Sequence, residues 1–370
     1  MTSSRAILRL VRTIMALFLP ALVFVACDVH EFPVDEPEKV DCKYLLHLRF
    51  DTDLPIFKEV FYENGSLSEA RSRSGRSPEY DIRYIINLYP AVRTGEYSRS
   101  AEHSFVRTVP RAHGLDADFE LPVPPGDYRI YVWADYVGHD EAVDLFYDTS
   151  DFSEIIIANR NDYVGDDDFR DAFCGSLDAK VDYGPEYSLS RNREIIVEGT
   201  VRMERPLAKY RFISTDLAEF IKQQFDSRRS AFSAAQAPGA EDASRALDLS
   251  EYSVRVIYSQ YLPCSFNMFT NRPADSWTGV SYKSALLQIS DDEAEVCFDY
   301  VFINGGESTV SVALEIYYSD GELVASTAPF NVPLKRSKLT EVRGTFLTTN
   351  SGGALGINPE FEGEYNIFVY

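Results

Sequence analysis

Cys27 is the residue whose type and setting point most directly to chemistry. It ends an apolar run, residues 14–26, and Asp28 follows it. A cysteine thiol in that place can accept a diacylglyceryl group, and cleavage before it leaves the lipidated cysteine as the first residue. Three arginines precede the run, which is shorter than the roughly 20 residues that a membrane-spanning helix needs. Residues 1–26 are therefore predicted to be a lipoprotein signal peptide.

Lipid on Cys27 would anchor the chain to a membrane, since each buried methylene contributes about 0.8 kcal/mol. The predicted location is the cell outer membrane. Phe24 departs from the usual motif, in which an aliphatic residue stands at that place. Ordinary secretion, with Cys27 left as a plain cysteine, is therefore the alternative. The acidic, proline-bearing residues 27–41 that follow are predicted to be a tether.

The histidines show no pattern that indicates catalysis. None has a partner at a metal-ligand spacing, such as two histidines four residues apart with a glutamate between them. The sequence also contains no nucleophile elbow, phosphate-binding loop or dinucleotide-binding fingerprint. The chain is therefore predicted to be non-catalytic, with no metal and no cofactor. The five histidines are His30, His47, His103, His113 and His139.

Two acidic clusters have the hard oxygen ligands that calcium prefers. Neither cluster fits the EF-hand pattern, so solvated acids on an acidic protein are the favoured interpretation. The clusters are Asp166, Asp167, Asp168 and Asp171, and then Asp291, Asp292, Glu293 and Glu295.

Aromatic side chains that stack on sugars would indicate a glycan-binding surface. Trp133 lies in a run that also holds several Tyr and Phe residues, and Trp277 lies far along the chain. Because Trp133 is in phase with Tyr131 and Asp135 on a predicted strand, a half-buried place in a sheet is the favoured interpretation.

The net charge of −22 over 370 residues argues against nucleic acid as a partner. Four cysteines follow Cys27: Cys42, Cys174, Cys264 and Cys297. An oxidising envelope permits disulfides between them. Their wide, irregular spacing is equally compatible with buried free thiols.

The elements that position these residues are predominantly strands. Tyr44, Leu46, Leu48 and Phe50 alternate on one face of a predicted strand. The alternating residues 119–123 and the strand-like residues 128–136 flank Pro124-Pro125-Gly126-Asp127, which predicts an antiparallel hairpin. Similar patterns predict strands at residues 82–89, 194–203, 207–213, 252–258, 296–303, 310–318, 323–326, 339–347 and 366–370.

One helix is predicted at residues 216–225, with Asp216 as its cap and Glu219 as the capping-box partner. Residues 140–187 are expected to form an irregular loop region, and residues 227–247 a flexible insertion or linker. The sequence therefore predicts an all-β fold with one minor helix.

Several stretches resemble the fimbrillin-type lipoproteins of Bacteroidales, which include fimbrial subunits and anchors. The stretches are Ala26-Cys27-Asp28 with Phe32-Pro33, residues 127–136 (DYRIYVWADY), 205–209 (RPLAK), 331–336 (NVPLKR), 344–347 (GTFL) and 361–363 (FEG). The resemblance implies two tandem transthyretin-like antiparallel β-sandwich domains, residues 42–205 and 206–370. Part of this group carries only an unknown-function label.

The resemblance also implies a route of assembly. Structural subunits of such fimbriae travel as lipoproteins and then lose their first strand to an Arg-specific protease, so that a neighbour's strand takes its place. Arg49 is the candidate processing residue. Because the opening of the chain resembles members that keep their N-terminus, Arg49 is expected instead to be a solvent-facing strand residue.

The predicted function is that of a non-catalytic envelope lipoprotein that acts in fimbrium assembly, anchoring or adhesion. Its predicted partners are the membrane, through Cys27, and other fimbrial subunits. A surface lipoprotein that binds glycans or another ligand is the alternative.

Overall fold

The computed structural model describes residues 42–50, 60–63, 66–69, 80–184, 195–234, 248–349 and 366–369. The predicted signal peptide, Cys27 and the tether lie outside these residues. The sheets belong to one compact unit, formed by Cys42–Tyr183 and Ile196–Tyr370. In the described part of the chain, no helix is both long and apolar enough to cross a membrane.

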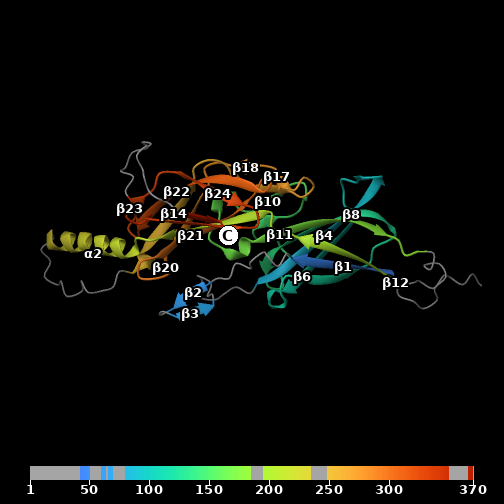
Figure 1. The fold of residues 1–370 in the computed structure, drawn as a ribbon, viewed down its shortest axis with the longest axis horizontal. Coiled ribbons are helices and arrows are strands. Elements are labelled where there is room, and N and C mark those ends of the chain that lie inside the picture. Colours follow the sequence, from blue (N-terminus) through green and yellow to red (C-terminus); the bar gives the residue numbers. More distant parts are fainter. Residues whose placement is uncertain are drawn as a thin grey trace, which may run out of the picture. The chain divides into compact units, whose positions relative to one another are not determined.

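The first pair of sheets is built from the N-terminal half (Figure 1). One sheet has the order β12-β1-β7, from Ile195–Met203, Cys42–Phe50 and Ala117–Leu121. The other has the order β11-β8-β4, from Ala172–Val181, Gly126–Gly138 and Tyr80–Arg93, with β5 (Glu96–Tyr97) and β6 (His103–Pro110) also paired to β4. The ring of Tyr84 on β4 lies 5.3 Å from that of Phe119 on β7, so the two sheets share an apolar interior.

The second pair of sheets comes from the C-terminal half. One sheet has the order β20-β21-β13-β25-β26, from Leu287–Gln288, Ala294–Phe302, Leu207–Ser214, Leu339–Gly344 and Asn366–Val369. The other holds β19 (Ser281–Ala285), β14 (Tyr252–Tyr258), β22 (Glu307–Tyr318), β23 (Leu323–Ser326) and β24 (Phe330–Lys335). Only β13 and β25 run parallel among these described pairs. The rings of Phe212 and Phe330 meet across the interior at 5.2 Å.

The remaining elements are short. They are β2 (Val60–Glu63), β3 (Ser66–Glu69), β9 (Tyr147–Asp148), β10 (Ile155–Ile157), β15 (Leu262–Pro263), β16 (Ser265–Asn267), β17 (Arg272–Pro273), β18 (Ser276–Trp277), and the 3-10 turns η1 (Arg111–His113), η2 (Arg160–Asp162), η3 (Asp168–Arg170) and η6 (Leu249–Glu251). Over the residues that the structure describes, the all-β prediction, with one α-helix, is confirmed. The predicted division into two domains near Pro206 stays a prediction.

The expected hairpin around Pro124 and Pro125 is wrong. β7 before the turn pairs with β1, whereas β8 after it pairs with β4 and β11. The turn therefore connects two sheets. Each proline lacks a backbone N–H, so this segment has few donors with which to close a ladder.

The expected loop region 140–187 is also more ordered than predicted. It contains β11, which pairs along its whole length with β8. It also contains β9 and β10, and β10 pairs with β16 of the other half of the chain. Gly175 disguised β11 in the sequence because glycine weakens a strand pattern. A Cβ at Gly175 would lie 2.5 Å from the carbonyl oxygen of Arg202, so a close approach of backbone requires glycine here.

The helix α2 spans Leu217–Ala234, longer than predicted, and takes up the first part of the expected insertion 227–247. The Asp216 carboxylate contacts the segment after β25 instead of forming the expected capping box. It accepts hydrogen bonds from the backbone N of Thr348 at 2.8 Å and from its hydroxyl at 2.7 Å. Glu219 contacts Gln223 and Lys222 of the same helix. Asp216 thus fixes the segment that follows β25 to the start of the helix.

Candidate functional site around the first strand

The first strand, β1, is the inner strand of its sheet. It lies between β12 and β7, and Leu46 is in register with Phe119 of β7. Tyr44, Leu46 and Leu48 are buried with at most 2% of their surface exposed. This alternation follows from the two-residue period of a strand. Burial of each such side chain contributes about 1.5–3 kcal/mol, so this strand contributes strongly to the core.

The opposite face of β1 carries charged side chains. The Nδ1 of His47 lies 2.8 Å from the Oδ1 of Asp118, and the Nη2 of Arg49 lies 2.6 Å from the same oxygen. Hydrogen bonds from these two side chains lower the pKa of the Asp118 carboxyl. Both Arg49 and Asp118 are substantially exposed, so each such pair contributes at most about 1 kcal/mol.

Arg49 lies on the solvent-facing side, between Leu48 and Phe50. Its guanidinium also donates to the carbonyl of Ala117 at 3.2 Å. The peptide bond that a cut after Arg49 would break is held in place, because Phe50 N donates to Asp116 at 2.9 Å. A protease that needs an extended, accessible chain would first have to open this end of β1. Arg71, Arg73 and Arg76, which are other candidate targets of an Arg-specific protease, lie outside the described residues.

The first acidic cluster consists of structural partners, so the prediction of solvated acids is wrong here. Asp171 is buried and receives two hydrogen bonds from the Nε of Arg205, at 2.8 and 2.9 Å. Asp168 pairs with Lys209 and accepts a hydrogen bond from the hydroxyl of Tyr300. The basic partners lie more than thirty residues away along the chain, which is why the acids alone looked like a solvated run.

The second acidic cluster is mixed. Asp291 and Asp292 are exposed, as predicted. Glu293 pairs with Arg343, and Glu295 lies 3.7 Å from Arg211. Only the first two acids therefore fit the prediction.

A buried ionic cluster joins the segment before β11 to the C-terminal half. Arg170 pairs with Asp299, and both are almost completely buried. The Asp299 carboxylate also accepts hydrogen bonds from the hydroxyls of Tyr163 at 2.7 Å and Tyr258 at 2.6 Å, and from the backbone N of Tyr300 at 2.7 Å. Burial raises the pKa of the Asp299 carboxyl, and Arg170 and the tyrosines oppose that rise.

The spacing of these residues in the sequence does not predict this cluster. One signal was present, since Asp299 interrupts the apolar run of β21, and a lone acid in such a run needs a partner. We call Arg170, Asp299, Tyr163 and Tyr258 the buried lock.

The three described cysteine side chains, of Cys174, Cys264 and Cys297, are buried thiols that are not in disulfides. Burial raises the pKa of Cys174 and of Cys264 to about 12. A thiol with so high a pKa carries almost no thiolate at neutral pH and is a poor nucleophile. The side chain of Cys42 lies outside the described residues.

The two tryptophans differ in exposure. Trp133 is fully buried, more deeply than the predicted half-buried place, and its ring meets that of Tyr147 at 5.5 Å. Trp277 is half-buried, with the guanidinium of Arg160 5.6 Å from its ring centre. Tyr261, next to the strand paired with Trp277, is 70% exposed. Of the two tryptophans, Trp277 is therefore the one that offers part of its ring to a ligand.

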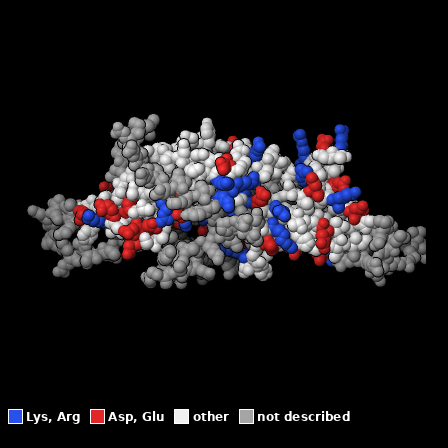
Figure 2. Space-filling model, viewed as in Figure 1, with Lys and Arg blue, Asp and Glu red and all other residues white. Residues whose placement is uncertain are grey.

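The charge on the face in view is interspersed (Figure 2). Basic and acidic side chains of the described residues are intermingled over much of that face.

No protein with a curated description matches the chain in sequence. Similar solved structures include the fimbrial anchor protein Mfa2 from Porphyromonas gingivalis, at 9% identity and a TM-score of 0.37, covering 89% of this chain and 97% of that one. A candidate cell adhesion protein from Bacteroides eggerthii has 10% sequence identity and a TM-score of 0.41, and the match covers 89% of this chain and 96% of that one. A candidate polysaccharide-binding protein from Bacteroides thetaiotaomicron has 11% sequence identity and a TM-score of 0.38, and the match covers 77% of this chain and 80% of that one.

These identities and scores are low and do not by themselves assign a function. A family profile gives the firmer result, because it matches residues 37–369, nearly all of the chain after the predicted tether. The chain belongs to the family of unknown function DUF6562.

Proposed function

We propose that this chain is a non-catalytic lipoprotein of the bacterial cell envelope that acts as a fimbrial-type subunit in assembly, anchoring or adhesion. Two features of the sequence support the proposal: the lipidation motif at Cys27, and the resemblance to fimbrillin-type lipoproteins. Lipid on Cys27 would hold the protein at the outer membrane, with residues 27–41 as the tether.

The position of β1 is the observation that carries the proposal. This strand follows the proposed tether directly and is the inner strand of its sheet, between β12 and β7. Its removal would expose a strand edge on each neighbour and leave an apolar groove where Tyr44, Leu46 and Leu48 were buried. A strand from another subunit with the same alternation could fill that groove by β-augmentation.

We further propose that β1 is retained in the mature protein, as in an anchor. Arg49 is tied to Asp118 and Ala117, and Phe50 to Asp116. The buried side chains of β1 add the larger stabilisation. These contacts oppose the local opening that cleavage after Arg49 requires.

Arg-specific protease treatment tests the retention of β1. The folded wild-type protein and an Arg49→Lys variant are incubated with the protease, and the fragments are identified by intact mass. We expect the same fragments from both proteins, because Arg49 is protected in the fold. A fragment that begins at Phe50 in the wild type alone would instead support the polymerising type of subunit.

Glycan binding near Trp277 is the second candidate function. The half-buried Trp277 and the exposed Tyr261 favour it, since aromatic rings stack on sugars. A glycan array compares the wild type with Trp277→Ala, with Phe225→Ala as a control at an exposed aromatic on α2. Binding that only the Trp277 variant loses would support this function, and a flat array for the wild type would remove it. Trp133→Ala is not a useful test, because Trp133 is a core residue.

A further inference from the structure

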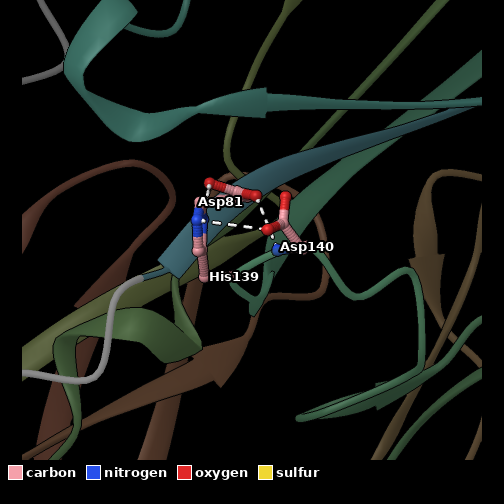
Figure 3. A group of neighbouring side chains, drawn as sticks. All are labelled: Asp81, His139 and Asp140. Atoms are coloured by element: carbon pink, nitrogen blue, oxygen red, sulfur yellow. Dashed lines mark hydrogen bonds and ion pairs between the residues drawn. The ribbon is translucent and has the colours of Figure 1, made fainter.

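We propose that Asp81, His139 and Asp140 form a binding site for a divalent transition metal ion, with Zn²⁺ as the probe of choice. The three residues offer donor atoms that all lie within 4.8 Å of one another. Asp81 comes from the start of β4, and His139 and Asp140 form the turn that follows β8 (Figure 3). The pairing of β4 with β8 places Asp81 opposite Val137, which brings the turn over the aspartate.

The geometry suits a small tetrahedral ion. Zn²⁺ binds nitrogen and oxygen ligands at distances that place neighbouring donors about 3.3–3.5 Å apart. The Nδ1 of His139 lies 3.2 Å from the Oδ1 of Asp81, close to that separation. The side chain of Asp140 is 88% exposed, so it can rotate to bring an oxygen to the same ion. Three protein ligands leave a fourth position for water.

Asp81 is prepared as a ligand by its surroundings. Its side chain is only 7% exposed, and its Oδ2 accepts a hydrogen bond from the backbone N of Asp140 at 3.1 Å. The Oδ1 faces His139. One oxygen of the buried carboxylate is thus held by the backbone of the turn, and the other is directed toward the imidazole.

The nearest basic side chain on the same strand is neutralised by other acids. Arg83 lies two residues after Asp81 on β4, and its guanidinium pairs with Asp135 at 2.6 Å and with Asp144 at 2.7 Å. The carboxylate of Glu141 folds back over Gly138, next to His139, and adds negative charge. The electrostatic setting thus favours a cation.

The ligand set selects the class of metal. An imidazole nitrogen suits Zn²⁺, Ni²⁺ and Cu²⁺, whereas Ca²⁺ and Mg²⁺ prefer oxygen ligands alone. A bound ion would link the start of β4 to the turn after β8. That turn begins the segment that carries Arg170 of the buried lock.

His47 provides a matched control, because it too lies beside two acids. Its Nδ1 is 2.8 Å from Asp118 and its Nε2 is 3.9 Å from Glu198. However, the Nη2 of Arg49 lies 3.2 Å from that Nδ1, where its charge would repel a metal ion. The two clusters therefore share residue types and differ in the presence of a competing cation.

Calorimetric titration with ZnCl₂ tests the site on chelator-treated protein at neutral pH. We expect one Zn²⁺ ion per chain for the wild type, affinity weakened at least about tenfold in His139→Ala and in Asp140→Asn, and unchanged affinity in His47→Ala. Both substituted site residues are largely exposed, and circular dichroism of the metal-free variants checks their fold. Absence of Zn²⁺ binding by the wild type, or full affinity in His139→Ala, would overturn the proposal.

Discussion

Substitution of Arg170 by alanine tests directly whether the buried lock stabilises the fold. Arg170 lies in η3, in the N-terminal half, and pairs with Asp299 of β21 in the C-terminal half. Its guanidinium also lies 4.5 Å from the centre of the Tyr163 ring. The variant would leave the Asp299 carboxylate buried without a cation, because Tyr163 and Tyr258 donate only neutral hydroxyls.

The expected loss is large compared with the stability of a typical domain. Loss of one partner of a buried ion pair costs about 3–5 kcal/mol, whereas a native domain is stable by about 5–15 kcal/mol. A double variant, Arg170→Met with Asp299→Asn, should lose less than Arg170→Ala, since it leaves no uncompensated buried charge.

Urea unfolding gives the free energy of unfolding of each variant. The matched control is Arg255→Ala, whose pair with Glu315 is exposed and 3.5 Å long, and whose loss should cost at most about 1 kcal/mol. If Arg170→Ala lost no more than Arg255→Ala, the buried lock would not stabilise the fold and the reasoning would be refuted.

The dependence on pH gives a second readout of the same variant. Burial already raises the pKa of Asp299 in the folded state, and loss of Arg170 removes the main effect that opposes this rise. The pKa of such a carboxyl is about 3.9 in the unfolded chain. When its pKa is higher in the folded protein, the free energy of unfolding falls as the pH rises from the unfolded pKa to the folded pKa. Arg170→Ala should therefore be less destabilised at pH 5 than at pH 8. An equal loss of unfolding free energy at pH 5 and at pH 8 would show that Asp299 remains ionised in the variant at both pH values.

Three further predictions concern other parts of the described chain. Cys264 and Cys297 should react with iodoacetamide only in denaturant, as peptide mapping would show; rapid labelling in native buffer would contradict their burial. Asp216→Ala should lower the free energy of unfolding by about 1–3 kcal/mol, because it removes the hydrogen bonds to Thr348. Glu219→Ala, on the exposed surface of the helix, should change the free energy of unfolding by less than about 0.5 kcal/mol. Equal effects of the two substitutions would argue against the contact between Asp216 and the segment after β25. Gly175→Ala should cost about 1–3 kcal/mol by overpacking, and unchanged urea unfolding would show that the neighbouring backbone can move.

The strands were predictable where their side chains follow a single period. β1 alternates, and Tyr44, Leu46 and Leu48 are buried as that alternation requires. Residues 128–136 were predicted to be a strand, and β8 covers them and pairs on both sides, with β4 and β11. In these elements the local pattern of side chains agrees with their burial, so the sequence alone was sufficient to predict the strands.

The partners of strands and charges were not predictable in the same way. The turn at Pro124 looks like a hairpin locally, but the choice of sheet depends on β1 and β4, far away in the sequence. Asp171 looks like a surface acid until Arg205 is placed beside it. The candidate metal site needs residues 58 positions apart, because Asp81 and His139 meet only through the pairing of β4 with β8.

The mass of the mature protein, purified from the native membrane, tests the central proposal most directly. The account predicts a chain that begins at Cys27, carries diacylglyceryl there and retains all of β1. A chain without lipid at Cys27 would contradict the envelope-lipoprotein proposal. A chain that begins at Phe50 would contradict the retention of β1 and indicate a subunit that accepts a neighbour's strand.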